Sequence, residues 1–140
     1  MGDKKTARAI WTGEDLNFHG VLGSGYEFEM SSDAGVHGGS PMELFLGSVA
    51  GCTAVDIVLI LKKKRKTITG VEVEIIGTRA DTIPKVYTDA ELRYTITGDV
   101  DAKSVEDAIR LTKEKYCSAS IMFAAAGVKF STSYQINPES

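Results

Sequence analysis

The sequence predicts an α+β fold, because strand-like and helix-like segments occur in separate blocks along the chain. Segments with the two-residue period of strands come first, and a long apolar helix follows; two strands, two helices and a final strand complete the order. The chain has 140 residues, 43% of them hydrophobic and 25% charged, which is ordinary for a folded domain. We therefore expect residues 1–140 to form a single domain.

Three short strands are expected near the N-terminus, where glycines and polar turns separate the apolar segments. The clearest is Tyr26–Met30, in which apolar and acidic residues alternate, as in a strand with one solvent-exposed face. The other two are Lys5–Trp11 and Leu16–His19.

A helix start follows at Ser40, which stands at the N-cap position with Pro41 at the first helical position. Glu43 stands where it can close a capping box with Ser40. Apolar residues then surround the helix on almost every side up to Leu61, and we expect it to continue to Lys64. A chain this short cannot bury all sides of so apolar a helix. We therefore expect a partner subunit to bury part of its surface.

The second half of the chain repeats the strand and helix patterns. We expect a helix over Asp101–Tyr116, because Val105, Ala108, Ile109, Thr112 and Tyr116 fall on one face. The remaining elements are strands around Val71–Ile75 and Leu92–Ile96, a turn at Asp81–Lys85, a short helix at Ala119–Ala126 and a strand at Val128–Ile136.

The two cysteines are the residues that most need explaining. Cys52 lies inside the apolar helix among small residues, and Cys117 lies just before the start of a helix, where free backbone N–H groups favour a thiolate. Taken singly, either could be an inert buried residue. A zinc site is not expected, because neither has a second ligand at short spacing, and nothing orients His19 or His37 as a catalytic base.

Charge and composition exclude several classes of protein. The net charge of −3 argues against nucleic-acid binding. Met1–Ala9 lacks the apolar core of a signal peptide, and Asp56 argues against a membrane span within Leu44–Leu61, so we expect a cytoplasmic protein. The basic run Lys62–Lys66 either complements the helix dipole or binds an anion.

Two motifs resemble those of the OsmC/Ohr superfamily, the osmotically inducible and organic hydroperoxide resistance proteins. The first is Ser40-Pro41-Met42-Glu43-Leu44 with the following Gly47–Asp56, which contains Cys52. The second is Glu114–Ala119, which contains Cys117. The order of the expected elements is also similar, and the motif variants look most like an uncharacterised OsmC-like branch of the superfamily.

The resemblance implies an antioxidant, stress-response enzyme: a thiol-dependent peroxidase that reduces organic hydroperoxides. Cys52 would be the peroxidatic cysteine and Cys117 the resolving cysteine, which forms a disulfide that an external thiol or dithiol reduces. No cofactor or metal is implied. The implied architecture is an OsmC-like fold with antiparallel sheets around a long, buried central helix, in an intertwined homodimer.

The sequence departs from the family where the thiolate should be activated. Members of the family place a glutamate ten positions before the peroxidatic cysteine, where this chain has Met42, and Glu43 lies about 180° around the helix from Cys52. The family also supplies an N-terminal arginine, and here Arg8 is the single N-terminal arginine. Asp56, one turn after Cys52, would suppress a nearby thiolate if it is ionised.

Two other functions therefore remain open at the level of sequence. The chain could be a binding protein that holds a thiol-bearing or anionic small molecule near Cys52 and the run Lys62–Lys66. Alternatively, both cysteines could be packing residues in a protein whose role lies elsewhere.

Overall fold

The computed structural model describes residues 2–33, 35 and 37–138. Contacts within the chain divide it into two compact units, Met1–Phe45 and Leu46–Ser140, and each is described here by itself. That the whole chain acts as one domain stays a prediction.

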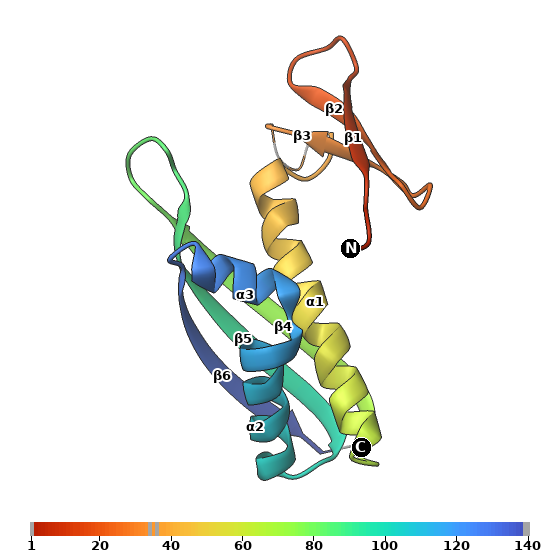
Figure 1. The fold of residues 1–140 in the computed structure, drawn as a ribbon, viewed down its shortest axis with the longest axis vertical. Helices are drawn as coiled ribbons and strands as arrows, with labels where there is room; N and C mark the ends of the chain where they lie inside the picture. Colours follow the sequence, from red (N-terminus) through yellow and green to blue (C-terminus); the bar gives the residue numbers. More distant parts are fainter. Residues whose placement is uncertain (1, 34, 36, 139–140) are drawn as a thin grey trace. The chain divides into compact units, whose positions relative to one another are not determined.

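The N-terminal unit contains a three-stranded antiparallel sheet with the strands in chain order (Figure 1). The three predicted strands are confirmed, with bounds that differ by at most three residues. Gly25, at φ +97°, makes the turn before the third strand, a conformation that favours glycine. The strands are β1 Ala7–Trp11, β2 Asn17–Leu22 and β3 Glu27–Ser31.

The long helix α1 spans Pro41–Lys63, close to the predicted range. Its predicted capping box is confirmed: the Ser40 N–H donates to Glu43 Oε1 at 3.0 Å, and the Glu43 N–H donates to Ser40 Oγ at 3.3 Å. The Ser40 N–H and the Ser40 hydroxyl both donate to the Glu43 carboxyl, and these hydrogen bonds lower its pKa. Glu43 is therefore engaged in starting the helix.

The C-terminal unit contains a second three-stranded sheet, in the order β4-β5-β6. Strands β4 (Thr67–Arg79) and β5 (Tyr87–Asp99) form an antiparallel hairpin, whereas β6 (Lys129–Asn137) pairs parallel with β5. The α+β class is confirmed, but this parallel pair corrects the expectation of purely antiparallel sheets. The reason is the helical crossover between β5 and β6, which returns the chain to the same end of the sheet.

The helices of the C-terminal unit cover one face of this sheet (Figure 1). Besides α1, they are α2 (Ala102–Leu111) and α3 (Ser118–Ala125). On α3, the Phe123 ring lies 5.8 Å from the ring of Tyr87 on β5, measured between centroids. Between α1, α2 and β5 lies a buried core made of Ile57, Leu61, Leu92, Tyr94, Ile96, Val105, Ala108 and Ile109.

Within the single chain, helix α1 buries a stripe and not its whole surface. The buried stripe repeats every four residues and consists of Val49, Thr53, Ile57 and Leu61. Leu59 is 61% exposed and Val55 is 58% exposed, so the expected cover on every side is absent from this chain alone. By length and composition α1 could also cross a membrane, with a mean hydropathy of 2.2, the one such helix in the part of the chain described here.

The second predicted helix ends earlier than expected. Regular α-helix stops at Leu111, and Thr112–Tyr116 forms a π-helical turn. Because a π-helical turn takes more residues than an α-helical turn, it rotates the following side chains around the axis. Tyr116 is consequently 50% exposed, and its predicted place on the buried face is wrong.

Candidate functional site

The two cysteines are brought together within the C-terminal unit. Cys52 lies on α1 and is half-buried, whereas Cys117 lies between the π-helical turn and α3 and has no exposed surface. Both thiols are free, and Cys52 lies close enough to Cys117 to raise the pKa of the Cys117 thiol. The sequence predicted a functional pair, and the fold places its members next to each other.

The environment of Cys117 acts on its thiol in opposite directions. Burial is the largest influence and raises the pKa of the Cys117 thiol, and the contact with Cys52 raises it further. Hydrogen bonding from Ser120 opposes this increase: the Ser120 N–H donates to Cys117 Sγ across 3.4 Å at the first turn of α3. The pKa of the Cys117 thiol is raised overall, so Cys117 is mainly a protonated thiol at neutral pH.

A chain of buried hydroxyl groups lies between α1, β5 and the π-helical turn. Thr53 Oγ1 is 3.1 Å from both the Tyr94 hydroxyl and Thr112 Oγ1, and Thr112 Oγ1 donates to Asp56 Oδ2 at 2.8 Å. Thr53 and Thr112 have no exposed surface, and Tyr94 has 1%. Burial raises the pKa of the Tyr94 hydroxyl, and the nearby Cys117 and Asp56 add to that increase.

Sequence reasoning did not find this chain of hydroxyls. One signal was present: Thr112 stands among apolar residues on the buried face of its helix, where a polar side chain needs a partner. Thr112 donates a hydrogen bond to the half-buried Asp56 carboxylate, and the sequence gives no sign of this pairing between residues 56 positions apart.

The arginines that the C-terminal unit places on its sheet and on α2 have partners away from the cysteines. Arg79 donates to the carbonyl oxygen of Lys85 at 2.7 Å, Arg93 forms ion pairs with two glutamates, and Arg110 pairs with Asp107. Arg8 lies on β1 of the other unit. Arg79, Arg93 and Arg110 are therefore engaged with partners other than the cysteines.

The basic run Lys62–Lys66 is partly neutralised by acidic residues at α2. Lys64 Nζ lies 3.5 Å from Asp107 Oδ2, and Lys66 Nζ lies 3.0 Å from Asp101 Oδ1. Its contact with Lys66, and above all its hydrogen bonds from Ser104, lower the pKa of the Asp101 carboxyl. The run therefore ties the end of α1 to the start of α2 and offers less free charge than the sequence indicated.

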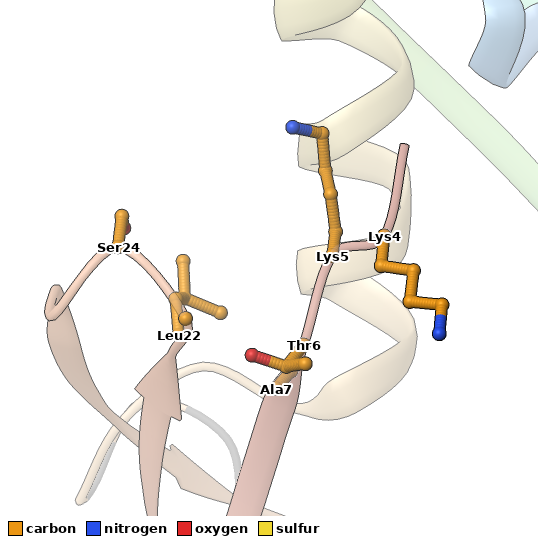
Figure 2. Close-up of a pocket in the computed structure, with 7 residues that line it drawn as sticks. Lys4, Lys5, Thr6, Ala7, Leu22 and Ser24 are labelled. Atoms are coloured by element: carbon orange, nitrogen blue, oxygen red, sulfur yellow. The ribbon is translucent and has the colours of Figure 1, made fainter. Parts of the chain in front are cut away.

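Two surface pockets bear on ligand binding. One, of about 260 Å³, is lined by Asp56, Leu59, Ile60, Lys63 and Tyr116, beside the turn of α1 that follows Cys52. The other, of about 640 Å³, lies in the N-terminal unit and is lined by residues 4–7 and 22–24, which face each other in Figure 2. No group of three or more potential metal ligands occurs among the residues that the structure describes.

With this geometry established, comparison with known proteins defines the class. Residues 32–133 match the family model described as OsmC-like protein. The chain therefore belongs to the OsmC-like family, as its two cysteine motifs predicted.

The relatives are consistent in both sequence and structure. The chain is 36% identical to protein YhfA of Escherichia coli strain K12 over 131 residues, which cover 93% of this chain and 96% of that protein. A crystal structure of a hypothetical protein from Aquifex aeolicus is 30% identical, with a TM-score of 0.89 over 99% of this chain and 100% of the other.

More distant structures share the fold. An OsmC-like protein from Mycoplasma pneumoniae has a TM-score of 0.86 at 15% identity, over 98% of this chain and 99% of the other. An organic hydroperoxide resistance protein from Elizabethkingia anophelis has a TM-score of 0.72 at 17% identity, over 98% of this chain and 99% of the other. The α+β architecture is therefore that of OsmC-like and organic hydroperoxide resistance proteins.

Proposed function

We propose that this protein is a thiol-dependent peroxidase that reduces organic hydroperoxides. In the first step the Cys52 thiolate attacks the O–O bond, takes one oxygen as a sulfenic acid and releases the alcohol, whose oxygen gains a proton. In the second step the Cys117 thiol condenses with this sulfenic acid to give a disulfide and water. Two external thiols, or one dithiol, then reduce the disulfide and are themselves oxidised to a disulfide.

One observation carries the proposal: the two free thiols lie near each other within the C-terminal unit, and their accessibility differs. Cys52 is half-buried and lies one turn before Asp56, which lines the pocket of about 260 Å³, so a peroxide can approach it. Cys117 has no exposed surface and lies near Cys52, which suits a residue that reacts with the first cysteine and not with solvent. Burial raises the pKa of the Cys117 thiol, which also favours the order in which Cys52 reacts first.

The proposed working form is a cytoplasmic homodimer. Helix α1 and the segment that follows α2 expose large apolar side chains in the single chain, which a second copy would cover. These side chains are Leu44, Phe45, Val55, Leu59, Tyr116, Ile121 and Met122. Sedimentation analysis of the purified protein tests this part of the proposal, and a monomer at micromolar concentration would contradict it.

The activity is tested by adding cumene hydroperoxide to the reduced protein and following peroxide loss with dithiothreitol as reductant. We expect consumption by the native protein and a background rate for Cys52→Ser. Cys117→Ser, the matched control, should still form one sulfenic acid per chain, detectable by dimedone labelling and mass spectrometry. Equal peroxide loss in native protein and Cys52→Ser would refute the assignment.

A second candidate function is binding of a thiol-bearing or anionic small molecule with little peroxidase activity. The pocket that contains Asp56 and Lys63 favours it, because an apolar surface there combines with one group of each charge. Native mass spectrometry of the protein as isolated distinguishes the two functions. A retained ligand together with background peroxide loss would replace the peroxidase proposal.

A further inference from the structure

Thr112 links the surroundings of both cysteines through two different groups. Its side chain reaches α1, where Oγ1 donates to Asp56 Oδ2 at 2.8 Å and lies 3.1 Å from Thr53 Oγ1. Its backbone reaches the other cysteine, because the Cys117 N–H donates to the Thr112 carbonyl oxygen at 2.8 Å. Thr53 directly follows Cys52 in the chain, and Asp56 lies one turn further along the same face.

The direction of the hydrogen bonds in this chain can be derived. The Thr112 hydroxyl has a single proton, and it donates this proton to Asp56 Oδ2. Thr112 Oγ1 must then accept from Thr53, and Thr53 Oγ1 must accept from the Tyr94 hydroxyl. The protons all point towards Asp56, and a chain of hydrogen bonds aligned in this way strengthens each member.

These hydrogen-bonded hydroxyl groups lie next to the π-helical turn that precedes Cys117. Such turns interrupt regular helical hydrogen bonding and are common at functional sites. Here the turn begins at Thr112, whose side chain is the point at which the turn is hydrogen-bonded to α1. The Thr112 hydroxyl therefore joins α1, which carries Cys52, to the turn that precedes Cys117.

We propose that Thr112 and its acceptor Asp56 are positioning residues for closure of the Cys52–Cys117 disulfide. This inference rests on the proposed function, because it concerns that function's second step. In that step the Cys117 thiol and the Cys52 sulfenic acid form an S–S bond and release water. Neither Thr112 nor Asp56 reacts; they hold the π-helical turn so that the two sulfur atoms meet.

The experiment uses a reaction that needs no peroxide. The reduced protein is mixed with the aromatic disulfide DTNB, whose thiol product TNB is coloured. Attack by Cys52 gives a mixed disulfide and releases one TNB; attack by Cys117 on the Cys52 sulfur then forms the internal disulfide and releases the second. The first phase reports on Cys52, and the second reports on closure.

Thr112→Val is the informative variant, because it removes the hydroxyl, keeps the side-chain shape and changes no charge. We expect its second phase to be slower by about fivefold or more, with the first phase unchanged within about twofold. Thr112→Ser restores the hydroxyl and should return the second phase to within about twofold of native.

Ser104→Ala is the matched control for loss of a hydroxyl–carboxylate bond. Ser104 Oγ donates to Asp101 Oδ1 at 2.8 Å, the distance found between Thr112 and Asp56, but at the opposite end of α2 from the cysteines. Its closure rate should stay native. If Thr112→Val does not fold, Asp56→Ala removes the same hydrogen bond from the other side and should slow the second phase.

The outcomes separate this inference from the function on which it rests. A native protein that releases only one TNB would refute the two-cysteine function itself. Two native phases with an unchanged second phase in Thr112→Val, or equal slowing in Ser104→Ala, would overturn the positioning role alone. Slowing in Thr112→Val with recovery in Thr112→Ser supports it, whatever the rate with peroxide.

Discussion

The two units of the chain differ sharply in how they bury their residues. The C-terminal unit has a core between one face of its sheet and helices α1 and α2, with buried hydroxyl groups that bond to one another. In the N-terminal unit, the described residues classed as buried are Gly20 and Ser31. Its large side chains are open, with Trp11 59% exposed and Tyr26 66% exposed.

This difference shows that the two units obtain their stability from different sources. A three-stranded sheet without a covered apolar face is marginal in water, whereas a sheet packed against helices is stable. The C-terminal unit, which contains both cysteines, has such packing within the single chain. The N-terminal unit needs cover from another surface, which is what the proposed homodimer would supply.

The largest effect should come from a cavity in the C-terminal core. Ile57→Ala removes a side chain with no exposed surface from the contact between α1 and the sheet. We expect the free energy of unfolding to fall by about 2–5 kcal/mol, measured by urea denaturation followed by far-UV circular dichroism. Lys62→Ala, exposed near the end of the same helix, should change it by less than about 0.5 kcal/mol. Similar losses in both would show that α1 does not contribute through this core.

A smaller effect, on association, should follow from substitution in the N-terminal unit. Trp11→Ala removes a large exposed aromatic side chain from β1, and we expect it to weaken dimerisation by about tenfold, or about 1.4 kcal/mol. Sedimentation velocity over a dilution series measures this change. Glu14→Ala, which replaces an exposed polar residue of the same unit, should leave the dissociation constant of the dimer unchanged. If the two variants dimerise equally well, the cover comes from elsewhere.

The helix cap should contribute less again. Ser40→Ala removes the side-chain acceptor at the start of α1 and should cost about 1 kcal/mol in urea denaturation. Ser40→Asp keeps an acceptor at this position and should recover most of that loss. An unchanged stability for Ser40→Ala would mean that the first turn of α1 is held by other contacts.

The smallest effect concerns pH and the N-terminal sheet. His19 lies on β2 between Glu27 and Glu29 of β3, and its hydrogen bonds to both carboxylates raise the pKa of its imidazole. Protonated His19 therefore adds stability that is fully present below about pH 6.5 and is lost as pH rises through the raised value. An NMR titration should give a pKa above 6.5 in the native protein and a lower one after Glu27→Gln and Glu29→Gln together. No difference between the two proteins would exclude this pair of contacts in solution.

Local sequence patterns predicted the elements that local chemistry determines. The capping box of Ser40 and Glu43 fixed the start of α1, and the alternation in Tyr26–Met30 indicated β3 within one residue at each end. The two cysteine motifs predicted the family. Each of these features depends on neighbours a few positions away in the chain.

The features that sequence reasoning missed depend on contacts between distant segments. Thr112 looks like an exception on an apolar helix face until Thr53 and Asp56 are seen beside it. The π-helical turn, which leaves Tyr116 exposed, has no signal in the local sequence pattern, and the parallel pairing of β6 follows from the helical crossover. The fraction of α1 that a single chain buries likewise depends on tertiary and quaternary packing, which local sequence patterns do not contain.

The hydrogen bond from the Ser120 N–H to Cys117 Sγ gives the protein a built-in spectroscopic probe. A proton shared with sulfur has an amide resonance that shifts when the charge or bonding of that sulfur changes. In a nitrogen–proton correlation spectrum, the Ser120 peak should therefore occupy distinct positions for the thiol, the thiolate and the disulfide. In isotope-labelled protein, the redox state of the buried cysteine can then be followed without a dye, a chemical modification or a substitution.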